Sequence, residues 1–213
     1  AFLNGRTLYL KVIIMISAFF PFFYYLFIGA MTPGPNNVML TASGMNFGYR
    51  KTVPHIAGIM GGYTTLLMLC VIGVGAAVKA FPELMFALKY FGAAYLLYLS
   101  YKIVMAGRIG LDKQRKSTAR PLSFFEAYAF QFVNPKALVF ALSSMSLLPE
   151  NTSMIAMMIA AFIAGILCSG ISTNCWALIG QAIAKVFRDD KIRLIINLIL
   201  AALLLATLPL MIS

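Results

Sequence analysis

Two short polar segments, about a hundred residues apart, contain the residues whose chemistry stands out. They are Thr32-Pro33-Gly34-Pro35-Asn36-Asn37 and Asn134-Pro135-Lys136. The Asn36 and Asn37 amides can bind both an ammonium and a carboxylate, and a helix that begins after Pro35 would offer free N–H groups to an anion. Lys136 adds a positive charge that would fit an α-carboxylate. These residue types indicate a site for a small zwitterion.

Both segments interrupt strongly apolar stretches. Pro33, Pro35 and Pro135 remove backbone donors and break a regular helix, while Gly34 permits φ values that other residues avoid. Broken backbone inside a membrane is tolerated only against protein or a wet cavity. A simple kink would explain one break, but breaks at corresponding places in two halves of a chain are typical of a transporter's binding site.

The composition is that of an integral membrane protein. Of 213 residues, 62% are hydrophobic and 11% charged, with a mean hydropathy of +0.89, whereas a soluble domain carries about 25% charged residues. Six apolar runs are long enough to cross about 30 Å of hydrocarbon. They cover Val12–Met31, Val53–Val78, Leu84–Met105, Leu122–Leu148, Ser153–Ala184 and Ile192–Ile212. The segment Asn37–Phe47 is too short to span and is predicted to be a re-entrant or interfacial helix.

The basic residues predict an orientation. Twelve of the 17 Lys and Arg residues fall on one side of the predicted spans, and that side should face the cytoplasm. They are Arg50, Lys51, Lys102, Arg108, Lys113, Arg115, Lys116, Arg120, Lys185, Arg188, Lys191 and Arg193. The net charge of +11 does not predict a nucleic-acid partner, because these residues sit in short loops and form no basic face interleaved with aromatic residues.

Three spans precede the long basic loop and three follow it, so the two halves would insert with opposite orientation. Pro33 and Pro135 lie 102 residues apart, and the small-residue runs that begin at Gly58 and Gly165 lie 107 apart. The predicted fold is therefore an all-α membrane protein of six transmembrane helices in two inverted three-helix repeats. Residues 1–11 would be an N-terminal extension, 12–106 the first repeat, 107–121 a cytoplasmic loop and 122–213 the second repeat.

Three segments resemble the lysine exporter superfamily, the LysE/RhtB amino-acid translocators: Thr32–Thr52, Lys89–Ile103 and Gln131–Phe140. The branch that contains cysteine and O-acetylserine exporters looks nearest, because of Asn174–Gln181 and the Gln131 segment. The resemblance implies export of amino acids or their derivatives across a bacterial inner membrane, driven by the proton gradient.

Lys136 is the one basic residue placed at mid-span, where a charge costs about 2.5 to 3.5 kcal/mol on insertion scales. A substrate carboxylate would offset this cost by pairing with the Lys136 ammonium. Alternatively, Lys136 binds carbonyls freed by Pro135 or Pro33, and both roles could alternate during transport. Since no intramembrane carboxylate is present to bind a second positive charge, neutral amino acids are favoured over lysine.

His55 and Glu126 are the titratable candidates for coupling transport to protons. Each has a plainer alternative, since His55 would be an interfacial hydrogen-bonding group and Glu126 would pair with Lys or Arg of the basic loop. The small-residue spacings Gly58/Gly62, Gly61/Thr65 and Ala161/Gly165 indicate close helix packing, either within the chain or in a homodimer. Lipid and an amino acid are the expected partners.

Other function classes find little support. Intramembrane proteases and zinc enzymes need paired carboxylates or His-Glu-x-x-His, but no Asp lies in a span and His55 is the sole histidine. Cys70, Cys168 and Cys175 have no metal-type spacing. No catalytic residue, metal or cofactor is therefore predicted. A passive channel or a membrane scaffold that transports nothing is the remaining alternative.

The charge asymmetry yields a topology prediction. A cysteine placed between Arg108 and Arg120 should resist impermeant thiol reagents added outside intact cells, because this loop is predicted to be cytoplasmic. A cysteine at Asn151 should react, and it serves as the matched control. External labelling of the basic loop would overturn the orientation.

Overall fold

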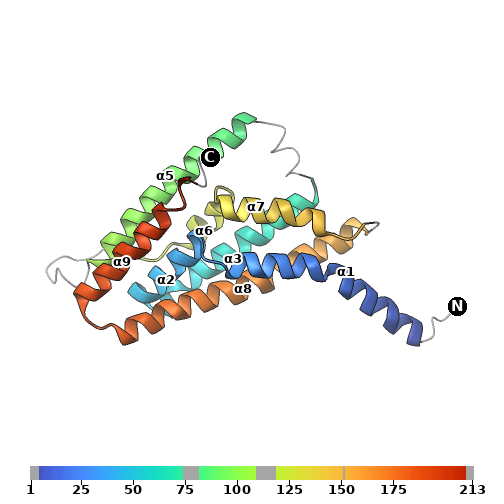
Figure 1. Ribbon diagram of the computed structural model, residues 1–213, viewed down its shortest axis with the longest axis horizontal. Helices are drawn as coiled ribbons and strands as arrows, with labels where there is room; N and C mark the ends of the chain where they lie inside the picture. Colours follow the sequence, from blue (N-terminus) through green and yellow to red (C-terminus); the bar gives the residue numbers. More distant parts are fainter. Residues whose placement is uncertain (1–4, 74–81, 109–118, 151, 210–213) are drawn as a thin grey trace.

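The computed structural model describes residues 5–73, 82–108, 119–150 and 152–209, and every regular element in these ranges is helical. Figure 1 shows the helices as an elongated bundle. The all-α prediction is confirmed. The elements are α1 (Gly5–Met31), α2 (Pro35–Phe47), α3 (Tyr49–Val71), α5 (Pro82–Gly107), α6 (Phe124–Phe130), α7 (Pro135–Ser144), the 3-10 turn η1 (Met145–Leu147), α8 (Met154–Val186) and α9 (Asp190–Leu205).

Each predicted apolar span contains helix, but the spans differ in how well they would cross a membrane. Among the described residues, α3 and α8 are long and apolar enough by themselves, and shorter apolar helices cover Ser17–Met31 and Pro135–Leu147. The fourth predicted span is divided into α6, a turn and α7. Residues 74–78 of the second span, 210–212 of the sixth and most of the basic loop lie outside the described residues. The number of crossings therefore stays a prediction.

The short helix α2 lies inside the bundle. Ten of its 13 residues are buried, and it packs mainly on α8, with α3, α5 and α9 also in contact. A helix at the membrane surface would expose one face to water and another to lipid, so burial on all sides favours the re-entrant alternative.

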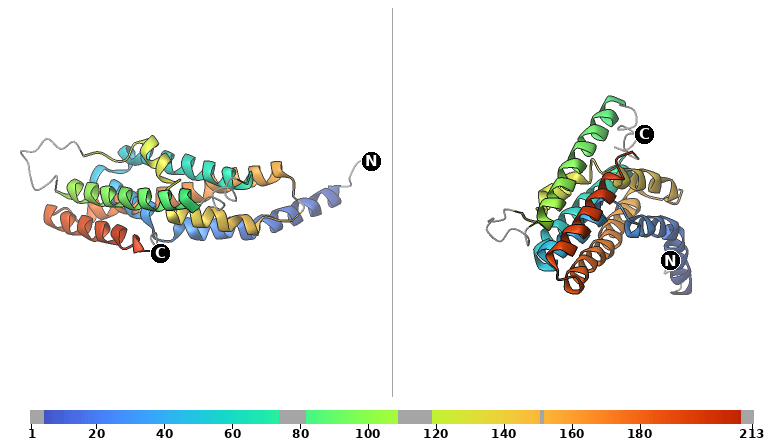
Figure 2. Two further views of the ribbon diagram at one scale, coloured as in Figure 1. Left: turned by 90° about the horizontal axis from the view of Figure 1, so that it is seen from above. Right: turned by 60° about the vertical axis from the view of Figure 1, so that its left-hand side comes forward.

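The packing of the two halves is related. Helix α3 packs on α8, and α5 packs on α9. Helices α6 and α7 of the second half contact α3, and helices α1 and α2 of the first half contact α8. These pairings remain when the first half is exchanged for the second, but the further contacts of α2 with α3, α5 and α9 have no comparable counterpart at α7. Figure 2 shows α5 beside α9 in both of its views.

The three described basic segments meet at one end of the bundle. The Tyr49 amide, next to Arg50 and Lys51, donates to Gln181 Oε1 near the end of α8 at 2.8 Å. Arg193 at the start of α9 donates to the Met45 carbonyl at 2.9 Å. Lys102 on α5 lines a cavity together with Phe47 and Arg120. The described segments used for the charge-based orientation therefore share one end of the structure.

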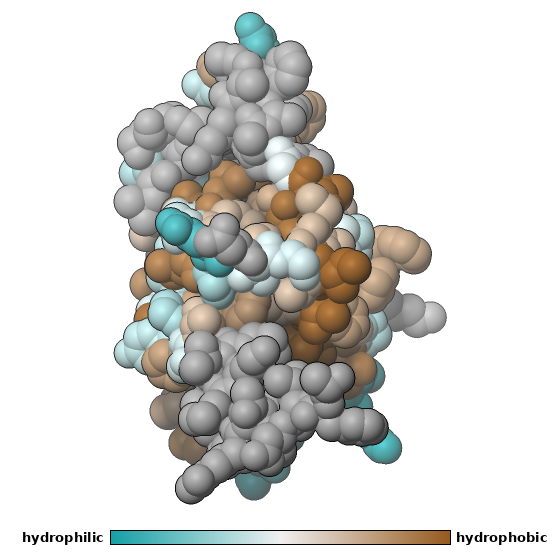
Figure 3. All heavy atoms as spheres, turned by 90° about the vertical axis from the view of Figure 1, so that its right-hand side faces the viewer, coloured by the Kyte–Doolittle hydropathy of each residue, from teal (hydrophilic) through white to brown (hydrophobic). Residues whose placement is uncertain are grey.

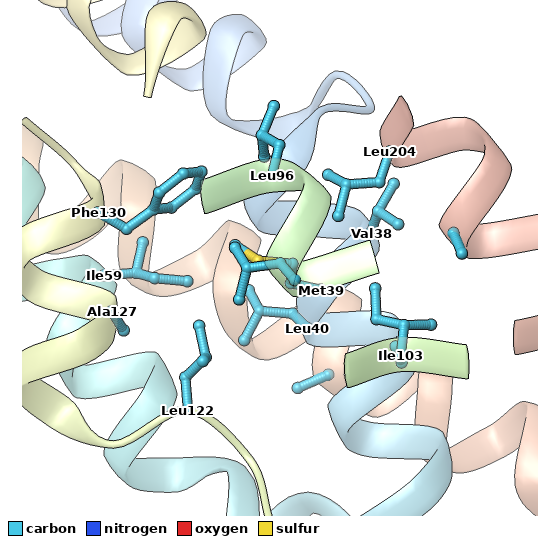
Figure 4. Close-up of a cluster of buried hydrophobic side chains, with 14 of the residues drawn as sticks. Val38, Met39, Leu40, Ile59, Leu96, Ile103, Leu122, Ala127, Phe130 and Leu204 are labelled. Carbon is cyan, nitrogen blue, oxygen red and sulfur yellow. The ribbon is translucent and has the colours of Figure 1, made fainter. Parts of the chain in front are cut away.

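Two groups of buried apolar side chains hold the bundle together. One is centred on Met39 and Leu40 of α2 (Figure 4), and the other joins Phe22 and Leu26 of α1 to α3, α7 and α8. Large apolar side chains also cover the outside, with Phe91, Phe125 and Ile155 more than 70% exposed. Figure 3 shows such side chains over one end of the molecule. Their exposure fits a lipid environment better than water.

Glycines permit the closest contacts between helices. A Cβ on Gly44 of α2 would overlap the Ala177 carbonyl of α8, and one on Gly180 would overlap the Thr41 carbonyl. Gly58 and Gly62 pack on the α6 backbone in the same way, and Gly165 packs on Thr64. Gly58, Gly62 and Gly165, which belong to the predicted small-residue spacings, are therefore used for packing within the chain.

The glycine contacts predict a difference between two Gly→Ala variants. Gly44→Ala should lower the stability of the detergent-solubilised protein by about 1–3 kcal/mol, because its methyl group must push two helix backbones apart. Gly61→Ala should be neutral or slightly stabilising, since its nearest neighbour, Phe124, would lie at an ordinary 3.5 Å. Thermal unfolding of both variants tests this. Equal melting temperatures would contradict the close α2–α8 packing.

Candidate functional site

The two broken segments meet at one pocket. It holds about 460 Å³ of empty space, counting solvent at its mouth. Five of the eight predicted substrate residues line it, namely Gly34, Asn36, Asn37, Asn134 and Lys136. Pro33, Pro35 and Pro135 are not among its lining residues. Their contribution is to end and begin the helices that present the others.

The first break is a short extended linker between α1 and α2. The Thr32 amide still donates to the Ile28 carbonyl, but Pro33 and Pro35 have no N–H to continue the helix. Helix α2 begins at Pro35, and its first helical bond runs from Val38 N to the Gly34 carbonyl at 3.0 Å. Proline is well suited to the first position of a helix because its missing N–H has no partner there.

Gly34 is explained by space and not by its backbone angles. Its φ of −176° is extended backbone that any residue adopts, so the expectation of an unusual φ was wrong. A Cβ at this position would lie 2.6 Å from Lys136 Cδ and 3.0 Å from Lys136 Nζ. The missing side chain therefore leaves room for the lysine to cross the break.

Three side chains bind the carbonyls at the end of α1. Asn37 Nδ2 donates to the Ala30 carbonyl at 3.0 Å and to the Thr32 carbonyl at 2.6 Å, and Ser172 Oγ donates to Ala30 at 2.6 Å. Lys136 Nζ donates to the Thr32 carbonyl and to the Pro33 carbonyl, the latter at 3.2 Å. Carbonyls without helical donors need such partners wherever no water can reach them. One side chain each from α2, α7 and α8 therefore converges on the last turn of α1.

The second break mirrors the first in its use of asparagine and proline. Asn134 caps α7 by accepting a bond from the Lys136 amide at 3.2 Å, and Pro135 opens the helix. A reciprocal amide pair joins the two breaks, since Asn36 Nδ2 donates to Gln131 Oε1 at 2.7 Å and Gln131 Nε2 donates back to Asn36 Oδ1 at 3.2 Å. Gln131 is fully buried. It was not among the predicted site residues, although it is a lone amide in an apolar run.

Hydroxyl groups from α3 and α8 complete the wall. Tyr63, Ser169, Ser172 and Thr173 line the pocket together with the Phe140 ring. The three α8 hydroxyl residues were missed, but their spacing places them on one face of an otherwise apolar helix, which is a recognisable signal. Within the described part of the lining, Lys136 is the charged residue and no carboxylate is present. The pocket therefore favours a ligand that brings a negative group.

His55 and Glu126 do not line this pocket. Glu126 completes a capping box with Ser123 and forms ion pairs with Arg120 at 2.6 Å and Lys102 at 3.8 Å, so the expected pairing with basic residues is present. His55 is completely buried, and its Nδ1 lies 3.2 Å from Ser43 Oγ. The His55 side chain is therefore enclosed by protein, beside Lys102 and Arg120 at the basic end of the bundle.

Comparisons with known proteins agree with this architecture. Residues 27–208 match the LysE type translocator family. A cysteine/O-acetylserine efflux protein of Shigella flexneri serotype 5b (strain 8401) is 31% identical over 194 residues, which covers 90% of this chain and 94% of the relative. The protein of the same name from Escherichia coli (strain K12) is 31% identical over 186 residues, covering 86% and 91%. No solved structure matches the chain significantly. With its two broken helices around one polar pocket, the chain belongs to the LysE type translocator family.

Proposed function

We propose that this protein exports a small neutral amino acid or derivative, such as cysteine, O-acetylserine or homoserine, from the cytoplasm across a bacterial inner membrane. The observation that supports this most directly is the convergence of two broken helices on a polar pocket that contains one cation and, among the described lining residues, no carboxylate. The names of the relatives support the same substrate class. Transport is proposed to be secondary-active and coupled to proton antiport.

The proposed membrane arrangement is six crossings in two inverted three-helix repeats. Support comes from the neighbour relations of the halves, where α1, α2, α3 and α5 correspond to α6, α7, α8 and α9. Inverted repeats of this kind place the substrate site near the bilayer midplane, at the repeat interface. The pocket lies at such an interface, because it is lined by α1, α2 and α3 from one half and by α7 and α8 from the other.

Binding of a zwitterion would replace contacts that the protein makes with itself. Lys136 now neutralises the carbonyl dipoles of Thr32 and Pro33. A substrate α-ammonium has the same chemistry as the lysine ammonium and would take these carbonyls, which frees Lys136 for the substrate carboxylate. Both alternatives for Lys136 are then used, at different stages of transport. Asn36, Asn37 and Asn134 stay with the helix ends and set the shape of the site.

The charge of the pocket explains the preference for neutral amino acids. A cationic side chain would add a positive charge beside Lys136 with no carboxylate among the described lining residues to balance it. The Tyr63 and Ser169 side chains suit a short polar substituent such as a thiol or a hydroxyl group. Glu126 and His55 remain the proton-coupling candidates, acting at a distance from the substrate.

Counterflow in proteoliposomes tests the proposed function. A labelled panel of neutral, cationic and acidic amino acids would be exchanged against unlabelled substrate, with and without an imposed pH gradient. Exchange of small neutral amino acids, accelerated by the gradient, is expected. Flux that ignores the gradient and shows no counterflow would indicate a channel, and absence of flux would indicate a scaffold.

Replacement of the pocket cation gives a residue-level prediction. Lys136→Gln should fold, because glutamine can still donate to the Thr32 or Pro33 carbonyl. It should bind a neutral amino acid roughly ten- to a hundredfold more weakly, since a charge-assisted hydrogen bond contributes about 1.5–3 kcal/mol. Binding of the matching decarboxylated amine should change little.

Lys185→Gln, which removes an exposed charge at the end of α8, is the control. Affinities for amino acid and amine, measured on the purified variants, separate the roles. If Lys136 only binds the freed carbonyls, both affinities fall together with thermal stability. If Lys136→Gln binds and exports the amino acid as well as the parent does, Lys136 is not the carboxylate contact.

A further inference from the structure

A second cavity opens at the basic end of the bundle. It holds about 350 Å³, again counting solvent at its mouth, and its polar lining consists of Ser43, Asn46, His55, Lys102 and Arg120. These residues come from α2, α3, α5 and the segment before α6. The cavity shares no lining residue with the pocket described above.

The charges around this cavity are unbalanced. Among the described residues around it, two cations, Lys102 and Arg120, flank one carboxylate, that of Glu126. Arg120 donates to both Glu126 oxygens and to the Pro121 carbonyl through its terminal nitrogens. Because a guanidinium has five N–H groups, it can donate to a further acceptor as well. The excess positive charge suits an incoming carboxylate.

His55 provides a second observation at the same cavity. Its Nε2 atom is buried and has no hydrogen-bond partner among the described residues. Buried polar atoms are nearly always paired, and an unpaired one in a cavity wall is a place where a ligand or water completes the structure. The neighbouring amide Asn46 is already paired with Asn197, at 2.6 and 3.1 Å, so it leaves the histidine nitrogen without a partner.

Helix α2 connects the cavity to the pocket. Asn36 near its first turn lines the pocket, and Asn46 in its last turn lines the cavity, so about 15 Å of helix separates them. The apolar cluster around Met39 fills the space between (Figure 4). Its member Ile59 lines the pocket, while Met39 and Ile103 line the cavity.

We propose that this cavity is a second, cytoplasm-facing site that receives the carboxylate of the transported amino acid at Lys102 and Arg120 before the amino acid passes the Met39 cluster. The inference rests on the proposed export function and on the charge-based orientation. Helix α5 and the segment before α6, which carry Lys102 and Arg120, then act in substrate capture. The Met39 cluster is then the barrier between capture and the central pocket.

Lys102→Gln tests the capture site, because it removes a cavity cation while Arg120 still holds Glu126. Initial export from proteoliposomes of controlled orientation would be measured at sub-saturating substrate over a range of ionic strength. The rate should fall about fivefold at low salt, and its salt dependence should flatten, since an attracting charge is lost. Export of the decarboxylated amine, which has no carboxylate to be captured, should not show this salt-dependent loss.

Arg108→Gln is the matched control, because Arg108 is an exposed cation just beyond α5 that does not line the cavity. Lys102→Arg should restore capture. If Lys102→Gln and Arg108→Gln behave alike, the capture site is wrong. A parent protein that exports no amino acid would instead refute the proposed function, before any variant is compared.

A thiol-protection measurement covers the case in which Lys102→Gln accumulates poorly. Ala106 lines the cavity, and Ala106→Cys in the otherwise native chain can be followed at that residue by mass spectrometry. A neutral amino acid should slow its modification by an anionic thiol reagent, and the matching amine should not. Equal protection by both compounds, or none by either, would overturn the proposal.

Discussion

The carbonyl groups at the end of α1 determine how the centre of this protein is built. Because the helix ends at the Pro33–Pro35 break, the carbonyls of Ala30, Thr32 and Pro33 receive no helical amide bond, and a membrane interior supplies no water to replace it. Asn37 from α2, Lys136 from α7 and Ser172 from α8 take over. Because these donors come from both halves of the chain, one local shortage of hydrogen bonds fixes the relative position of several helices.

The same constraint explains why the site is polar without being acidic. Carbonyl dipoles already provide negative potential, and an additional carboxylate would hold Lys136 permanently. Because the partners of Lys136 are carbonyls, another ammonium group can compete for them and release the lysine. Under the proposed function, a zwitterionic substrate would supply such a competitor and would also bring the carboxylate that pairs with the released lysine.

Much of this architecture could be predicted from residue patterns. The apolar runs predicted helices, and the Pro-Gly-Pro and Asn-Pro segments correctly indicated where they are interrupted. The breaks also proved to share one pocket, although their residues are about a hundred positions apart. These features are local in origin, because a proline breaks the helix at its own position and an apolar run of sufficient length forms a helix by itself.

Features that depend on contacts between distant segments were not predictable. The partner of Asn36 is Gln131, 95 residues away, and only the folded chain brings the amides together. Gly34 was predicted to provide a backbone conformation that other residues avoid, yet its role is to leave space for the Lys136 side chain. His55 was expected to be a hydrogen-bonding group near the cytoplasmic surface, and its position in the sequence did not indicate that the packing of α2 on α3 buries it completely.

The glycine contact between α2 and α8 limits how such a carrier can move. Gly44 lies against the backbone of Ala177, and Gly180 lies against that of Thr41, so the two helices interlock at two points. Sliding or twisting one along the other would force backbone atoms into each other. The pair must therefore travel as one rigid body that carries Asn37 and Ser172 with it. In the proposed transport cycle the most open hinge is the extended Pro33–Gly34 segment that joins α1 to α2, because the turn before α7 is closed by backbone hydrogen bonds at Gln131, Phe132 and Val133.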